Sequence, residues 1–209
     1  MRVRSVHWPP ILCTAGAGIS MGLSWPLLAL LLEREGASGF AIGTNASAQT
    51  VAALLAAPLA GAIIRRLGII STSSACISVM ALCFIALPLV GAGSAWLPLR
   101  FALGAAAFTL FTTTQTWIHA LCREEERGQV IGMFGFVWSV GFAGGPIIIS
   151  VFGIEGLAPF LAGIACLAAS AIPLAFGREQ EKKQMGFNGV RGFSSSSAQH
   201  LGRCSPSSP

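Results

Sequence analysis

Residues 128–154 read GQVIGMFGFVWSVGFAGGPIIISVFGI and contain no charged side chain. This run exceeds the roughly 20 apolar residues that a helix needs to cross a hydrocarbon core of about 30 Å. A spanning segment must satisfy its backbone hydrogen bonds internally, which leaves only helices and closed barrels. Barrel strands alternate in segments of about ten residues, whereas this run is longer and continuously apolar. The segment is therefore predicted to be a transmembrane helix.

Five further stretches of the chain lack charge and are long enough to span a bilayer. They cover residues 5–32, 36–64, 67–99, 101–122 and 156–177. Of the 209 residues, 54% are hydrophobic and 10% are charged, whereas soluble domains are about a quarter charged. We predict an all-α membrane protein with six transmembrane helices at about residues 11–32, 41–64, 69–91, 95–121, 129–151 and 157–176.

The lysines and arginines are distributed unevenly between the predicted loops. If the spans alternate, one side of the membrane receives Arg2, Arg4, Arg65, Arg66, Arg123, Arg127, Arg178, Lys182 and Lys183. The opposite loops carry Arg34 between two glutamates, and then Glu155. Because cytoplasmic loops are enriched in Lys and Arg, both termini are predicted to be cytoplasmic. The net charge of +5 is thus a topology signal and does not indicate nucleic-acid binding.

The chain divides by composition into three parts. We expect a cytoplasmic N-terminus at 1–10, a six-helix bundle at 11–177 and a disordered, Gly- and Ser-rich cytoplasmic tail at 178–209. Two proline pairs, Pro58 with Pro146 and Pro88 with Pro173, are separated by nearly the same offset. Such an offset suggests a three-plus-three inverted repeat, which is common in secondary transporters.

The cytoplasmic end of the second predicted helix carries a glycine-bounded basic segment. Gly61 lets a neighbouring helix approach closely, and Gly68 permits a tight turn into the third helix. Arg65 and Arg66 stand between these glycines and are suited to bond helix-end carbonyls or to pair across a loop.

The fourth predicted helix opens with an arginine inside the membrane. Arg100 is followed one turn later by Gly104. A charge within the bilayer costs a few kcal/mol, so Arg100 is expected to face protein or water. The alternative is a side chain near the boundary that snorkels to the headgroups.

The fifth predicted helix contains a small-residue face and a proline. Gly141 and Gly145 stand one turn apart and favour close packing, while Pro146 removes a backbone donor and bends the helix. Gly18 and Gly22 repeat this spacing in the first helix. Without a second bundle, these faces are expected to lie against lipid.

Taken in order, these segments resemble the major facilitator superfamily of secondary transporters. The matching residues are Gly61, Arg66 and Gly68, then Arg100 and Gly104, then Gly141, Gly145 and Pro146, with Arg127 and Gly128 resembling the pair that opens helix five. The loop departs from the family pattern because Arg65 replaces its Asp. The sequence looks closest to the YcaD-type bacterial permeases, which implies a multi-pass protein of the bacterial inner membrane.

Several intramembrane side chains are candidates for a substrate cavity. They are Arg100, Gln115, Trp117, Asn45, Gln49 and Trp25. Polar groups within a span face the bundle or a water-filled cavity. The alternatives are interhelical hydrogen bonds from the segment Thr112–Thr116 and Gln115, and helix packing for the tryptophans.

The resemblance implies secondary active transport of a small solute by alternating access, with this chain as the N-terminal half of a permease that leans to efflux. Such a half requires a second copy or a separate C-terminal half in the bilayer. We expect no transport by a monomer. In a monomer, polar Gln49 and Gln115 are also expected to lack protein neighbours. The alternative is a truncated or scaffold membrane protein without transport activity. No catalytic constellation, metal-ligand spacing or cofactor motif occurs in the sequence, so an intramembrane enzyme is disfavoured.

Overall fold

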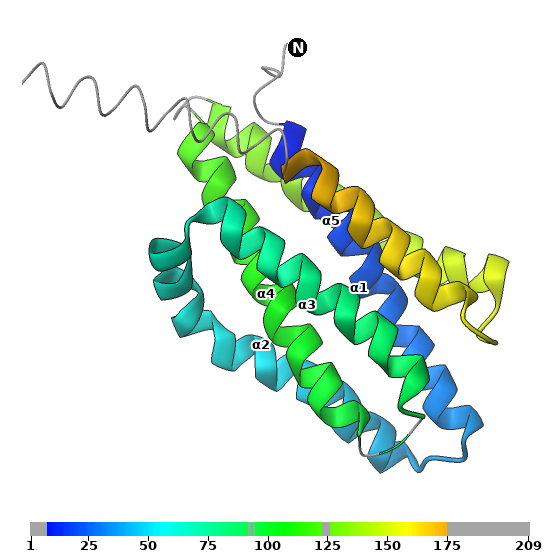
Figure 1. The fold of residues 1–209 in the computed structure, drawn as a ribbon. Coiled ribbons are helices and arrows are strands. Elements are labelled where there is room, and N and C mark those ends of the chain that lie inside the picture. Colours follow the sequence, from blue (N-terminus) through cyan, green and yellow to red (C-terminus); the bar gives the residue numbers. More distant parts are fainter. Residues whose placement is uncertain (1–7, 92, 94, 123–125, 175–209) are drawn as a thin grey trace, which may run out of the picture. The chain divides into compact units, whose positions relative to one another are not determined.

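A computed structural model of the chain describes residues 8–91, 93, 95–122 and 126–174 (Figure 1). Residues 1–7 of the predicted N-terminal segment 1–10 lie outside the described residues, and residues 8–10 belong to the first helix. The predicted tail at 178–209 and the basic loop residue Arg123 also lie outside the described residues.

Six helices account for nearly all of the described chain. They are α1 (Trp8–Arg34), α2 (Gly39–Leu67), α3 (Ile69–Leu89), α4 (Trp96–Leu121), α5 (Arg127–Phe152) and a sixth helix whose described part is Ala158–Leu174. The predicted all-α fold is confirmed, and the described residues contain no strand. Four helices, α1, α2, α3 and α5, are long and apolar enough to cross a membrane by themselves. Helix α4 has the length, with 26 residues, but carries Arg100 and a run of threonines.

The helices pack in two related groups (Figure 1). Helix α1 lies along α5, while α4 lies along both α2 and α3. The sixth helix contacts α1, where Ser20 Oγ donates to the Gly163 carbonyl at 3.2 Å. Exchanging the first three helices with the last three converts the α2–α4 pair into the α5–α1 pair. This correspondence is what the predicted three-plus-three repeat requires.

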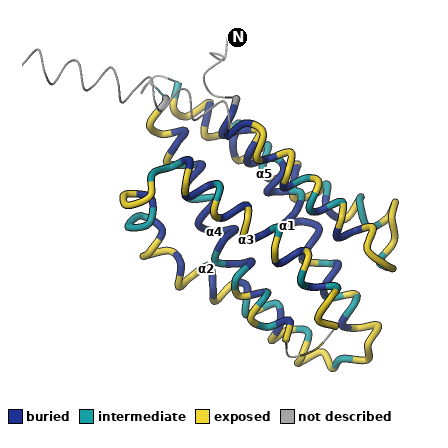
Figure 2. The backbone as a smooth tube through the Cα atoms, in the orientation of Figure 1, coloured by how far each residue is buried: buried dark blue, intermediate teal, exposed yellow. Residues whose placement is uncertain are grey.

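Burial is concentrated in α1, α3 and α4, which carry most of the core (Figure 2). Leu27, Phe84 and Leu103 are almost completely enclosed. Helices α2 and α5 are instead mostly exposed, and large side chains such as Leu59 and Phe136 protrude from them. A soluble protein rarely exposes so much contiguous apolar surface. The pattern therefore fits a bundle surrounded by lipid or by another membrane protein.

Two local features fix the connections on either side of α3. Gly68 has a φ of 81°, a backbone conformation that only glycine adopts readily, and it joins α2 to α3 in one residue. At the other end of α3, the indole Nε1 of Trp96 donates to the Leu87 carbonyl at 3.2 Å. This bond satisfies one of the carbonyls that a helix end leaves without a partner.

Candidate functional site

Arg100 is enclosed between α2 and α4 and is only 1% exposed. Its Nε donates to Asn45 Oδ1 at 2.8 Å, and its Nη1 donates to Gln49 Oε1 at 2.7 Å. Both amide side chains are themselves buried. The three residues form a cluster that we call the Arg100 network.

The network follows from two pairs of residues spaced one helical turn apart. Asn45 and Gln49 lie on one face of α2, and Arg100 and Gly104 lie on the facing side of α4. A methyl group at Gly104 would collide with the backbone carbonyl of Gln49. The missing side chain therefore lets the two helices approach closely enough for the arginine to reach both amides.

The charge of Arg100 is held without a carboxylate partner. The one ion pair within the described residues joins Arg34, the last residue of α1, to Glu155 in the connection that follows α5, at 2.8 Å. Charge-assisted hydrogen bonds to amide oxygens thus replace part of the hydration that the guanidinium loses. Because Arg100 is enclosed by protein, the alternative in which it snorkels to the headgroups is wrong.

A cavity of about 370 Å³ opens beside this network between α1, α2, α4 and α5. Its lining residues are Met21, Trp25, Gln49, Thr50, Ala53, Gly104, Ala107, Phe108, Phe111 and Trp138. We call it the central cavity. The rings of Phe111 and Trp138 meet edge to face at 4.8 Å between centroids. Four of the ten lining residues are aromatic, and none carries a charge.

Among the predicted cavity residues, Gln49 and Trp25 line the central cavity. Arg100 reaches it only through Gln49, to which it is bonded. Asn45 lines a separate pocket of about 310 Å³ toward the α2 N-terminus. The expectation that Gln49 would lack protein neighbours is wrong, because it also contacts Met21 Sδ at 3.6 Å.

The polar segment of α4 is arranged differently from either prediction for its threonines. The hydroxyls of Thr112, Thr113, Thr114 and Thr116 donate to carbonyls within α4 itself. Among the residues that the structure describes, these hydroxyls form no bonds to another helix. Gln115 is half-buried and lines none of the pockets described here, and Trp117 is buried in the main core. These two residues stay candidates from the sequence alone.

Sequence reasoning did not select Met21, Phe108 or Phe111. A signal for the two phenylalanines was present, because they recur at helical spacing with Gly104 and Ala107 on one face of α4. Polar residues within a span are the stronger sign of a cavity, and an aromatic stripe is also the ordinary pattern of a helix core. Whether such a stripe lines a cavity or packs in the core depends on which helix faces it.

The small-residue faces of α1 and α5 pack against each other. A methyl group at Gly18 would lie 2.9 Å from the Trp138 carbonyl, and one at Gly141 would lie 2.8 Å from the Ala15 carbonyl. One at Gly145 would collide with the backbone of Gly22. The expectation that these faces would lie against lipid is therefore wrong, because each is the other's partner within a single bundle.

Except for Pro146, the remaining motif residues lie at one end of the helices. Arg65 and Arg66 are exposed in the last turn of α2, near Gly61 and before the turn at Gly68. Arg127 and Gly128 are the first two residues of α5, and Arg127 Nε donates to His119 Nδ1 of α4 at 3.2 Å. Pro146 lies inside α5, one residue after Gly145.

The architecture and the buried cation define a helical membrane protein with a solute-sized cavity. The family model of the Major Facilitator Superfamily matches residues 11–203, and the chain belongs to this family of transporters. It is 27% identical over 154 residues to the uncharacterized MFS-type transporter YfkF of Bacillus subtilis (strain 168). The aligned segment covers 72% of this chain and 39% of the relative. The chain thus spans about two fifths of that relative's length. No solved structure matches the chain. The narrower likeness to YcaD-type permeases stays a prediction.

Proposed function

We propose that this chain forms one six-helix half, the N-terminal one, of a secondary active transporter. A small solute would bind in the central cavity, and rocking of this bundle against a second one would expose the cavity to each side of the membrane in turn. The observation that carries the proposal is the central cavity itself, which adjoins the Arg100 network and has the size of a small-molecule site.

The cavity lining favours an aromatic, amphipathic solute that is neutral or anionic. Trp25, Phe108 and Trp138 offer apolar faces, while Gln49 and Thr50 offer hydrogen bonds. The charge of Arg100 lies directly behind Gln49 and disfavours a cation in the cavity. Export is the direction that the motif in α5 suggests, and movement would be coupled to an ion gradient.

The second bundle would cover the exposed faces of α2 and α5. These helices border the central cavity and expose more large apolar side chains than α1 does. Two partners fit this role: a second copy of the chain in a parallel orientation, or a separate C-terminal half. The assembly would be a multi-pass protein of a bacterial inner membrane with its basic loops and both termini in the cytoplasm.

The proposal is tested with the full chain reconstituted in liposomes as a covalent tandem of two copies. Fluorescent aromatic solutes, one anionic and one cationic, are loaded and their efflux is followed under an imposed proton gradient. We expect gradient-dependent flux of the anionic solute, and loss of that flux in Ala53→Trp, because the indole would fill the cavity. Ala169→Trp, on the exposed face of the sixth helix, is the matched control and keeps the flux.

Three results would contradict the proposal. Flux that ignores the proton gradient would exclude coupled transport with protons, and a sodium gradient then tests the other common ion. Flux that Ala53→Trp leaves intact would remove the central cavity from the pathway. Absence of flux with both gradients, in the tandem and with a C-terminal half supplied, favours the scaffold alternative.

A further inference from the structure

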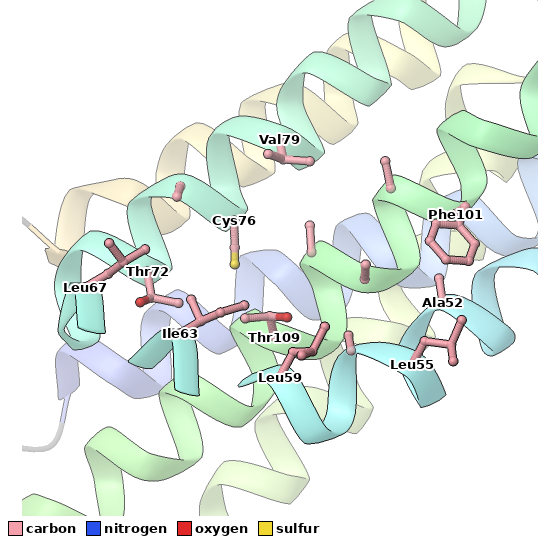
Figure 3. Close-up of a pocket in the computed structure, with 15 residues that line it drawn as sticks. Ala52, Leu55, Leu59, Ile63, Leu67, Thr72, Cys76, Val79, Phe101 and Thr109 are labelled. Atoms are coloured by element: carbon pink, nitrogen blue, oxygen red, sulfur yellow. The ribbon is translucent and has the colours of Figure 1, made fainter. Parts of the chain in front are cut away.

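A second cavity lies on the outer side of the bundle, between α2, α3 and α4 (Figure 3). Its volume is about 520 Å³, which is larger than the central cavity. Small residues of α4, including Ala102, Ala105 and Ala106, form its floor. Large aliphatic side chains such as Leu59 form the α2 wall, and Thr72, Ala75, Cys76 and Val79 form the α3 wall (Figure 3). We call this cavity the lateral groove.

The lateral groove offers an apolar occupant almost nothing to desolvate. Thr72 is one of the few hydroxyl residues that line it, and its Oγ1 already donates to the Gly68 carbonyl at 2.7 Å. Leu55 and Leu59 on its wall are more than half exposed. Because the groove opens toward the hydrocarbon of the bilayer, we expect an apolar group to fill it.

One end of the groove is closed and basic. The single-residue connection at Gly68 joins the two walls beside Leu67, and the last turn of α2 carries Arg65 and Arg66. On an ideal helix Arg66 lies about 60° from the groove-lining Ile63, whereas Arg65 lies about 160° from it. Arg66 therefore lies on the groove side of α2, and Arg65 lies on the far side beside Gly61.

The groove is longer than one leaflet of the hydrocarbon core is thick. Its α2 wall runs from Ala52 to Leu67, a rise of about 22 Å at about 1.5 Å per residue. Half of a hydrocarbon core measures about 15 Å. A chain that enters at the basic end and runs toward the bilayer centre would thus lie in the groove over its whole length.

From this placement we propose that the lateral groove is a binding site for an anionic phospholipid, with the phosphate at Arg66 and an acyl chain that runs from this basic end along the α2 wall toward the Ala102–Ala106 floor. The apolar lining and the closed basic end fit a molecule with one charged end and a long apolar chain. A bilayer-spanning helix fits less well, because it would meet the turn at Gly68. The site is independent of the proposed transport pathway, since Gln49 and the central cavity lie on another face of α2 and α4.

Native mass spectrometry of the purified full chain, with phosphatidylglycerol or phosphatidylcholine added, tests the proposal. We expect the unmodified chain to retain phosphatidylglycerol about fivefold better, the ratio that corresponds to about 1 kcal/mol for one arginine near a lipid surface. Arg66→Gln should abolish that preference, whereas Arg65→Gln, its matched control, should keep it. Ala105→Trp should displace both lipids by filling the groove.

Each remaining outcome overturns the proposal. Equal retention of the two lipids would indicate ordinary boundary lipid, and equal losses in Arg65→Gln and Arg66→Gln would indicate a general attraction to the basic loop. Disulfide crosslinking of two copies through Ala105→Cys in native membranes would show that a second copy occupies the groove. The arginine pair keeps the test decisive even where Ala105→Trp fails to fold.

Discussion

Arg100 brings a positive charge into the bundle, and the amides of Asn45 and Gln49 make that placement tolerable. The guanidinium donates hydrogen bonds to two amide oxygens, at 2.8 and 2.7 Å, rather than to a carboxylate. Removing one partner of a buried charge costs more than removing the whole group, because the remaining charge is left unsolvated. The network is therefore expected to respond asymmetrically to substitution.

Gln49→Leu should lower the free energy of unfolding by about 1.5–3 kcal/mol, the range for a hydrogen bond to a charged group. The triple variant Arg100→Leu, Asn45→Leu and Gln49→Leu should lose less, since no charge remains to be solvated. Titration with sodium dodecyl sulfate in mixed micelles, followed by far-ultraviolet circular dichroism, measures both values.

Gln115→Leu is the control for this prediction, because Gln115 is half-buried and bonds to nothing among the side-chain contacts described. It should change the free energy of unfolding by less than about 0.5 kcal/mol. Equal losses in Gln49→Leu and Gln115→Leu would mean that the Arg100 network contributes no more than an ordinary polar side chain.

At this scale the sequence predicts which residues are unusual but not their partners. That Arg100 avoids lipid follows from the cost of a charge in a bilayer. That it bonds to Asn45 and Gln49 depends on α2 lying against α4, which no local pattern reveals. The threonines show the converse, because the hydroxyls of Thr112–Thr116 find acceptors in their own helix and reveal nothing about neighbours.

At the scale of the element, helices pair where glycines remove side chains. Gly22 of α1 meets Gly145 of α5, and Gly104 of α4 meets the backbone of Gln49. Membrane helices gain little from the hydrophobic effect when they associate, so backbone approach and dispersion contacts carry the pairing. The glycine spacing was visible in the sequence, but not that the α1 face and the α5 face are partners.

Of two neighbouring glycines in α5, only one should lose stability when replaced by alanine. Gly145→Ala should destabilise the bundle by about 1–3 kcal/mol, because the new methyl group collides with the backbone of Gly22. Gly144→Ala should be neutral or stabilising by up to about 1 kcal/mol, since its methyl group would meet only Ile19 Cγ1 at 3.8 Å while alanine favours the helix.

The same micellar unfolding experiment compares these two variants under identical conditions. A loss of stability in both would mean that α5 needs flexibility at this point rather than close approach to α1. Stability gained in both would mean that the backbones of α1 and α5 are farther apart than the packing of Gly22 against Gly145 requires.

At the scale of the whole molecule, charged groups separate between the two ends of the bundle. The ion pair of Arg34 with Glu155 brings together the end of α1 and the connection that follows α5. The bond from Arg127 to His119 joins the end of α4 to the start of α5 at the opposite end. Because α2 and α4 run alongside in the same direction, with Asn45 opposite Arg100, Arg65 and Arg66 lie at that opposite end as well.

The number of helices, their approximate bounds and this segregation of charge were predictable, since each depends on local composition and on the thickness of a bilayer. The order of packing was only suggested by the proline offsets. It became clear from contacts between distant segments, such as Ser20 with Gly163. Which end faces the cytoplasm follows from insertion rules and stays a prediction.

Cysteine labelling tests that orientation with residues that the chain already provides. Cys122, directly after α4, is half-buried at the basic end, and Glu35→Cys places a thiol at the other end in an exposed loop. With the remaining cysteines replaced by serine, a membrane-impermeant maleimide should label position 35 in intact cells and Cys122 only in inside-out vesicles. Burial, helped by Glu126 and opposed by Arg127, raises the pKa of the Cys122 thiol.

A raised pKa leaves less thiolate at a given pH, and thiolate is the reactive form. Labelling of Cys122 should therefore be slower than that of position 35 at pH 7 and should accelerate as the pH rises, which distinguishes slow chemistry from a closed membrane. If Cys122 is labelled in intact cells at a rate that opening the membrane does not change, the basic end faces outward. The positive-inside argument would then fail for this chain, and with it the assignment of Arg66 to the cytoplasmic leaflet.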